Sequence, residues 1–118
     1  MTALEHDDSP VYLKLRASIA AAILRGEYRA GDQLPSVRAL AAEHGANPLT
    51  VAKAYQSFQD EGLIIVKRGV GMFVADGATR RLRSMERAYF LEQVWPRITC
   101  QMRRLGISLS DLSLDEKA

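Results

Sequence analysis

Residues 47–56 carry side chains suited to contacts with the edges of DNA base pairs. Asn47 followed by Pro48 is typical of a helix start, because asparagine caps the first turn and proline is tolerated within it. At about 100° per residue, one side of this helix collects Val51, Ala54, Tyr55 and Phe58, which we expect to be buried. The remaining positions offer hydrogen-bonding groups, small apolar groups and a single charge: Asn47, Leu49, Thr50, Ala52, Lys53 and Gln56. Base recognition needs hydrogen bonds and apolar contacts, and a helix N-terminus also favours phosphate.

The preceding helix decides between this interpretation and a merely efficient Asn-Pro cap. Ser36 is expected to cap a short helix that ends at Glu43, and Gly45 stops it. About four residues then separate the two helices, which is the connection length of a helix-turn-helix. Arg38 lies in the first turn, where it can contact phosphate or the groove; the alternative is a solvated arginine. Ser36 is first a cap and only secondarily a phosphate contact.

A hairpin follows at once and completes a winged helix-turn-helix. Residues 63–67 and 72–75 are rich in β-branched and apolar side chains, and Arg68-Gly69-Val70-Gly71 supplies the turn. Lys67 and Arg68 can enter a minor groove, while Gly69 and Gly71 permit close backbone approach. The alternative is that the glycines serve the turn alone. With a first helix beginning at Pro10, the fold class is α+β: three helices and a C-terminal β-hairpin wing over residues 10–76.

Residues 77–118 are expected to form a short all-α dimerisation tail after a hinge at Asp76-Gly77-Ala78. Pro96 predicts a break or kink at Trp95. The apolar positions are too many for two isolated helices to bury, so we expect the same unit of a second chain to cover them. The aromatic residues are interpreted as core rather than as a ligand pocket, and Cys100 as a small buried residue. The predicted interface comprises Leu82, Met85, Tyr89, Trp95, Ile98, Met102 and Leu105.

Charge and composition exclude several other classes. The N-terminal arm, residues 1–9, is acidic and polar without an apolar signal segment, and no apolar run is long enough to span a membrane, so a cytoplasmic location is expected. No cluster of His and Cys has metal-ligand spacing, and no nucleophile–base pair or phosphate-binding loop indicates an enzyme or a cofactor. Residues 79–105 hold seven arginines against two glutamates, whereas residues 1–75 hold equal numbers of basic and acidic side chains. DNA contact by the winged domain therefore depends on placement rather than on total charge.

Residues 10–74 resemble the DNA-binding domain of GntR-family transcriptional regulators. The motifs are the "PVY" entry, "GDQLPSVRALA", "NPLTVAKAY", "EGLI" and "RGVGMFV". The short helical remainder resembles the YtrA-type branch, and its roughly 40 residues are too few for the ligand-binding domain of larger branches. One departure is Ala52, where many family members carry arginine, so no base-reading arginine is assigned to this helix.

The resemblance implies a homodimeric repressor that binds a palindromic double-stranded operator. It implies that Arg38, Thr50 and Gly71 match positions used on DNA. No residue pattern identifies a small-molecule effector. The second interpretation of the same fold is a winged-helix protein-interaction module without sequence-specific DNA binding.

Overall fold

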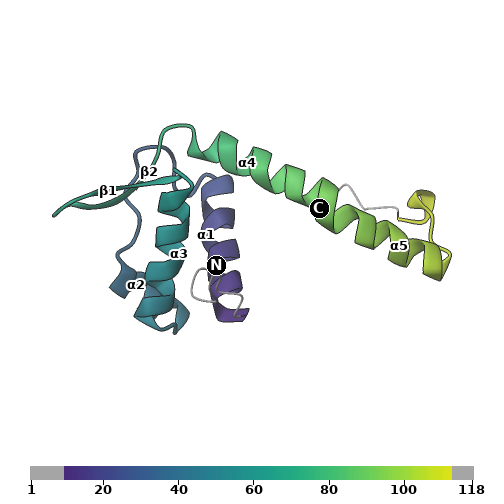
Figure 1. Ribbon diagram of the computed structural model, residues 1–118, viewed down its shortest axis with the longest axis horizontal. Coiled ribbons are helices and arrows are strands. Elements are labelled where there is room, and N and C mark those ends of the chain that lie inside the picture. Colours follow the sequence, from purple (N-terminus) through teal and green to yellow (C-terminus); the bar gives the residue numbers. More distant parts are fainter. Residues whose placement is uncertain (1–9, 113–118) are drawn as a thin grey trace. The chain divides into compact units, whose positions relative to one another are not determined.

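A computed structural model describes residues 10–112, and Figure 1 shows helices joined to one two-stranded sheet. The chain divides into two compact units, the first ending at Arg83 and the second beginning at Ser84. The predicted arm, residues 1–9, lies outside the described residues. The first unit is a winged helix, as predicted. In chain order the elements are α1 (Pro10–Leu24), α2 (Val37–His44), α3 (Pro48–Asp60), β1 (Ile64–Lys67), β2 (Gly71–Val74), α4 (Ala78–Tyr89), the π-helical turn η2 (Phe90–Val94), α5 (Trp95–Leu105) and the 3-10 turn η3 (Leu109–Asp111).

Side-chain caps set the starts of α2 and α3. The Ser36 hydroxyl accepts a hydrogen bond from the Ala39 N–H at 3.0 Å, and the Asn47 side-chain oxygen accepts one from the Leu49 N–H at 2.8 Å. Each cap satisfies an N–H that has no partner within its own helix. Between the helices, Gly45 takes the left-handed conformation with φ of 61°. Both predicted caps are confirmed, and together they fix the turn between α2 and α3.

The core of the first unit is built from the helix faces that the sequence predicts. The predicted face of α3, namely Val51, Ala54, Tyr55 and Phe58, is entirely buried. It packs with buried residues of α1 and α2, including Leu15, Ile19, Ile23, Leu40 and Ala41. This packing sets the rotation of α3 about its axis, and therefore which of its side chains face outward.

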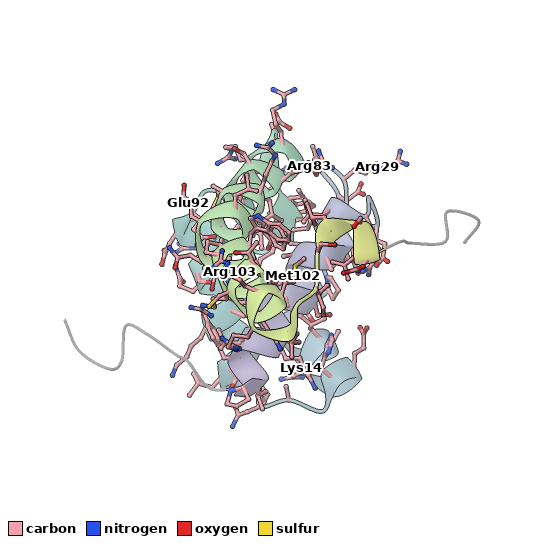
Figure 2. All side chains as sticks on the ribbon, turned by 90° about the vertical axis from the view of Figure 1, so that its right-hand side faces the viewer. Lys14, Arg29, Arg83, Glu92, Met102 and Arg103 are labelled. Carbon is pink, nitrogen blue, oxygen red and sulfur yellow. The ribbon has the colours of Figure 1, made fainter. Side chains whose placement is uncertain are left out.

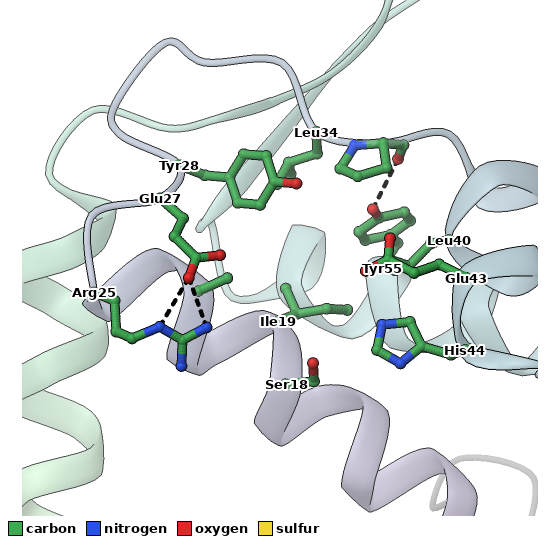
Figure 3. Close-up of a pocket in the computed structure, with 12 residues that line it drawn as sticks. Ser18, Ile19, Arg25, Glu27, Tyr28, Leu34, Leu40, Glu43, His44 and Tyr55 are labelled. Carbon is green, nitrogen blue, oxygen red and sulfur yellow. Dashed lines mark hydrogen bonds and ion pairs between the residues drawn. The ribbon is translucent and has the colours of Figure 1, made fainter.

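Tyr55 ties α3 to the segment that leads into α2. Its hydroxyl donates to the Pro35 carbonyl at 2.8 Å, as Figure 3 shows. Burial raises the pKa of Tyr55 above the ordinary 10.0, and the nearby Tyr28 and Glu43 raise it further. The neutral phenol is therefore the form that the folded chain stabilises.

Tyr55→Phe is expected to lower the free energy of unfolding by about 1 kcal/mol at neutral pH, because the Pro35 carbonyl loses its donor. Since the folded pKa of Tyr55 lies above its unfolded value, its contribution is complete below pH 10.0 and is lost as the pH rises beyond that value. Urea unfolding of both proteins at neutral pH and at about pH 11 checks this. The wild type should lose more stability between the two pH values than the phenylalanine variant; an equal loss would contradict it.

The wing is an antiparallel hairpin of β1 and β2, and a third short segment pairs with the other edge of β2. Ile64 pairs with Val74, and the register runs to Lys67 opposite Gly71. Beside β2, Gln33 forms an isolated bridge with Phe73, and the Leu34 N–H donates to the Met72 carbonyl at 2.8 Å. The segment before α2 therefore pairs briefly with β2 at Gln33.

The start of α4 is part of the winged domain. Ala78 and Leu82 are each only 1% exposed and belong to the same core as Phe58. Arg81, on the same turn, donates to the carbonyls of Glu61, Gly62 and Asp76 at 3.4, 2.7 and 3.4 Å. Leu82 therefore cannot serve the predicted dimer interface, because its side chain is already enclosed by its own chain. The first unit accordingly extends beyond the predicted boundary at residue 77.

The second unit is a helical segment with a π-helical turn before its proline. The Trp95 N–H donates to the Phe90 carbonyl, and Trp95 keeps helical φ and ψ of −58° and −42°. Of the break or kink expected at Trp95, a break is absent because the backbone stays helical there, and the irregularity before Pro96 takes the form of the π turn. Within residues 10–112, no helix is long and apolar enough to cross a membrane.

The second unit leaves its apolar side chains open to solvent. None of the described residues 84–112 is buried. The Phe90 and Trp95 rings stack with centroids 6.4 Å apart. Cys100, predicted to be buried, is exposed. Figure 2 labels Met102 and Arg103 on α5, where a half-buried thioether and an exposed guanidinium are adjacent in sequence. Large exposed apolar side chains are Met85, Tyr89, Phe90, Leu91, Leu105, Leu109 and Leu112.

Candidate nucleic-acid interface

The N-terminal turns of α3 present a small, mixed polar and apolar surface. Asn47 and Lys53 are exposed, and Leu49 is 64% exposed. Thr50 is half-buried on the flank, as its position in the helical pattern predicts. An exposed leucine on the first turn of a capped helix has no role in the protomer's core. The arrangement offers an amide, a hydroxyl, an isobutyl group and one ammonium on a single convex surface.

Arg38 adds a second cation at the start of α2. It is exposed, and neither of the two ion pairs within residues 10–112 involves Arg38 or Lys53. Both cations are therefore available to an external anion. Ser36, by contrast, uses its hydroxyl as the cap of α2, which is its first predicted role.

The Gln56 amide already has a partner, as do the capping side chains of Ser36 and Asn47. The Gln56 nitrogen donates to the Asp60 carboxylate at 2.9 Å, one turn further along α3. Contact with a base would require Gln56 to exchange that partner, and the carboxylate disfavours a phosphate nearby. The N-terminal half of α3 is therefore the better recognition surface.

The tip of the wing holds two cations in different environments. The Lys67 ammonium lies 4.6 Å from the centroid of the Phe73 ring, a cation–π contact that holds it against the hairpin. Arg68 and Gly69 are exposed in the turn that the Val70 N–H closes on the Lys67 carbonyl at 2.9 Å. Gly71 has φ of 145°, and an added Cβ would lie 2.3 Å from the Gln33 amide nitrogen. Gly71 thus serves the backbone conformation and the packing of Gln33 at once.

Two residues in the first unit have roles that sequence reasoning missed. Gln33 donates from its amide to the Val70 carbonyl at 3.0 Å, although the two are far apart in sequence. Arg81 lies in the arginine-rich first turns of α4, and its guanidinium donates to carbonyls at the C-terminal end of α3. That end lies about 20 Å along the helix from Asn47. The apolar residues Ala78 and Leu82, which precede and follow Arg81 in α4, were the sign in the sequence that this turn packs against the domain.

The cavity shown in Figure 3 lies away from the exposed face of α3. It has a volume of about 130 Å³ and is lined by residues of α1, α2 and α3 and of the segments between them, including Tyr28 and Tyr55. Among its polar side chains, the Tyr55 hydroxyl bonds to the Pro35 carbonyl, and Arg25 pairs with Glu27 at 2.8 Å. The recognition surface therefore comprises the N-terminal turns of α2 and α3 and the wing.

Residues 11–74 match the family model for bacterial regulatory proteins of the gntR family, which is more than half of the chain. The chain belongs to the GntR family. It is accordingly a DNA-binding transcriptional regulator. The HTH-type transcriptional repressor YtrA of Bacillus subtilis (strain 168) is 36% identical over 86 residues, which cover 73% of this chain and 66% of YtrA.

Solved structures of GntR proteins share the fold. A GntR family transcriptional regulator from Listeria monocytogenes superposes with a TM-score of 0.71 at 29% identity, covering 91% of this chain and 92% of that one. The AraR DBD in complex with operator ORX1 gives a TM-score of 0.54 at 27% identity, covering 57% of this chain and 81% of that one. The first similarity includes the helical tail, whereas the second covers little more than the length of the winged domain.

Proposed function

We propose that this chain is a homodimeric repressor that binds a palindromic operator, with α3 in the major groove and the wing in the minor groove. The observation that carries the proposal is the outward N-terminal face of α3, capped by Asn47 and presenting an exposed Leu49 and Lys53. Helix-turn-helix proteins place these turns of the second helix against base edges. Because operator DNA lies in the cytoplasm of a bacterial cell, the protein acts there.

Each exposed side chain of α3 has a contact suited to its chemistry. Asn47 and Thr50 can hydrogen-bond to base edges, and Leu49 can contact a thymine methyl group. Lys53 can donate to guanine or to phosphate. Arg38 and the cap region of Ser36 lie at the start of α2, the helix that crosses the DNA backbone in this motif. Gln56 is assigned a secondary contact because Asp60 already binds its amide.

The wing supplies the minor-groove contact. Arg68 at the exposed turn is the side chain best placed to enter a narrow groove, where negative potential attracts arginine. Lys67 can contribute phosphate contact from its position over Phe73. Gly69 and Gly71 keep the turn narrow enough for its backbone to approach the sugars.

The second unit is proposed to form the dimer. An isolated protomer exposes seven large apolar side chains over residues 85–112, more than a soluble monomer ordinarily leaves on one segment. A two-fold partner would cover them, and two recognition helices would then face half-sites one or more helical turns apart. Of the predicted interface residues, the six that remain after Leu82 are Met85, Tyr89, Trp95, Ile98, Met102 and Leu105.

Arg38→Ala and Lys53→Ala are each expected to weaken binding to the operator about tenfold, since each removes a cation aimed at phosphate or guanine. The probe is a duplex that the wild-type chain selects from a random library. The measurement is the dissociation constant at several salt concentrations. For a phosphate contact, the slope of log affinity against log salt should decrease by about one.

Lys14→Ala is the matched control, because Lys14 is an exposed lysine on α1. If Arg38→Ala and Lys53→Ala bind as tightly as Lys14→Ala, the contact assignment is wrong. The protein-interaction module makes a different prediction for the wild type: library selection would return no common sequence, and an apolar partner interface would be nearly insensitive to salt.

A further inference from the structure

The wing tip is held from outside the hairpin by the side chain of Gln33. A two-stranded hairpin is only marginally stable by itself, so the position of its tip depends on its neighbours. Backbone hydrogen bonds from the 31–34 segment support the base of the wing: the Gly31 N–H donates to the Val74 carbonyl at 2.8 Å, and the Val74 N–H donates to the Asp32 carbonyl at 3.0 Å. The Gln33 amide extends this support to Val70, inside the turn itself, at 3.0 Å.

The same short segment also holds the recognition helix. Pro35 accepts the hydrogen bond of the Tyr55 hydroxyl from α3, and Ser36 caps α2. Gln33 therefore belongs to a short segment, residues 33–35, that contacts the wing through Gln33 and α3 through Pro35. A displacement of the tip relative to α3 must break either the amide contact or the strand pairing beside it.

The absence of a side chain at Gly71 leaves room for the Gln33 amide to reach the Val70 carbonyl. An added Cβ at position 71 would lie 2.3 Å from the Gln33 amide nitrogen and 3.3 Å from its Cδ. A side chain there would expel the amide from the Val70 carbonyl. The φ of 145° also favours glycine, so position 71 carries both a conformational and a packing requirement.

We propose that Gln33 is a positioning residue for DNA recognition: its bond to Val70 sets the wing tip relative to α3, so that Arg68 meets the minor groove while α3 occupies the major groove. This role rests on the proposed function. Gln33 acts through the wing and needs no contact with the operator. Its loss should therefore affect minor-groove contacts selectively.

The test uses Gln33→Met, which keeps the length and neutrality of the side chain and removes its donor, with Gln59→Met as the matched control on the exposed surface of α3. The probe is the duplex selected by the wild type. Gln33→Met should bind about fivefold more weakly, as expected for one lost hydrogen bond. Hydroxyl-radical protection of the sugars under the wing should diminish, whereas protection of guanine N7 in the major groove should persist.

A double-mutant cycle separates positioning from direct contact with DNA. If the amide acts through the turn, Gly71→Ala should cost less affinity in a Gln33→Ala background than in the wild type, because the clash has been removed. Additive effects would overturn the proposal. So would unchanged sugar protection in Gln33→Met, or equal loss of protection in both grooves. Failure of the wild-type chain to select any sequence would instead overturn the proposed function.

Discussion

A fragment ending after Arg83 is expected to remain folded as a monomer and to bind the operator at least about 100-fold more weakly than residues 1–118. The fragment keeps the whole first unit, including the buried Ala78 and Leu82 and the clamp of Arg81 on Gly62. It loses every exposed apolar side chain proposed for the dimer. Each half-site must then be bound by an independent monomer, without the effective concentration that linkage provides. Sedimentation and titration against the selected duplex measure both properties.

A fragment ending after Ala75 is the informative comparison. It also lacks the dimer segment, but it removes the three α4 side chains that pack on the winged domain. We expect it to unfold at lower urea concentration than the fragment ending after Arg83. The two fragments thus separate loss of dimerisation from loss of the fold. A stable dimer of the fragment ending after Arg83 would contradict the role proposed for the second unit.

Much of the recognition surface could be predicted because it follows from local rules. Caps depend on residues a few positions apart, so Ser36 and Asn47 could be assigned from the sequence and lie as expected. The helical period predicts which side of α3 is buried, and all four predicted residues are buried. Once one side is buried, the opposite side must face outward, which places Leu49 and Lys53 on the surface.

Contacts between distant segments could not be read in the same way. The bond from Gln33 to Val70 depends on how the 31–34 segment pairs with β2, which no local pattern specifies. The clamp of Arg81 depends on three carbonyls from two separate turns. An arginine-rich helix start is as consistent with phosphate contact as with carbonyl capping, since the guanidinium donates to both.

Leu82 shows the same limit for apolar residues. It continues the helical stripe of Met85 and Tyr89, and periodicity shows that a face will be covered without showing which chain covers it. In the structure Leu82 is 1% exposed, whereas Met85 is 43% and Tyr89 is 58% exposed. The stripe therefore passes from the protomer's own core to the surface proposed for the partner within one helical turn.

Leu82→Ala is expected to destabilise the winged domain by about 2–5 kcal/mol, although it lies beyond the residues that match the family model. The removed methyl groups leave a cavity in a core that also holds Phe58 and Val74. The measurement is urea unfolding of the fragment ending after Arg83, in which dimerisation does not contribute.

The matched control is Leu49→Ala, the same change at a leucine that is 64% exposed. It should alter the free energy of unfolding by less than about 0.5 kcal/mol, since it opens no cavity. On the selected duplex residues 1–118 carrying Leu49→Ala should nevertheless bind more weakly, because the contact with a thymine methyl is lost. Equal destabilisation by the two substitutions would show that Leu82 is not part of the winged-domain core. The two leucines thereby distinguish a side chain that maintains the fold from one that the fold presents to DNA.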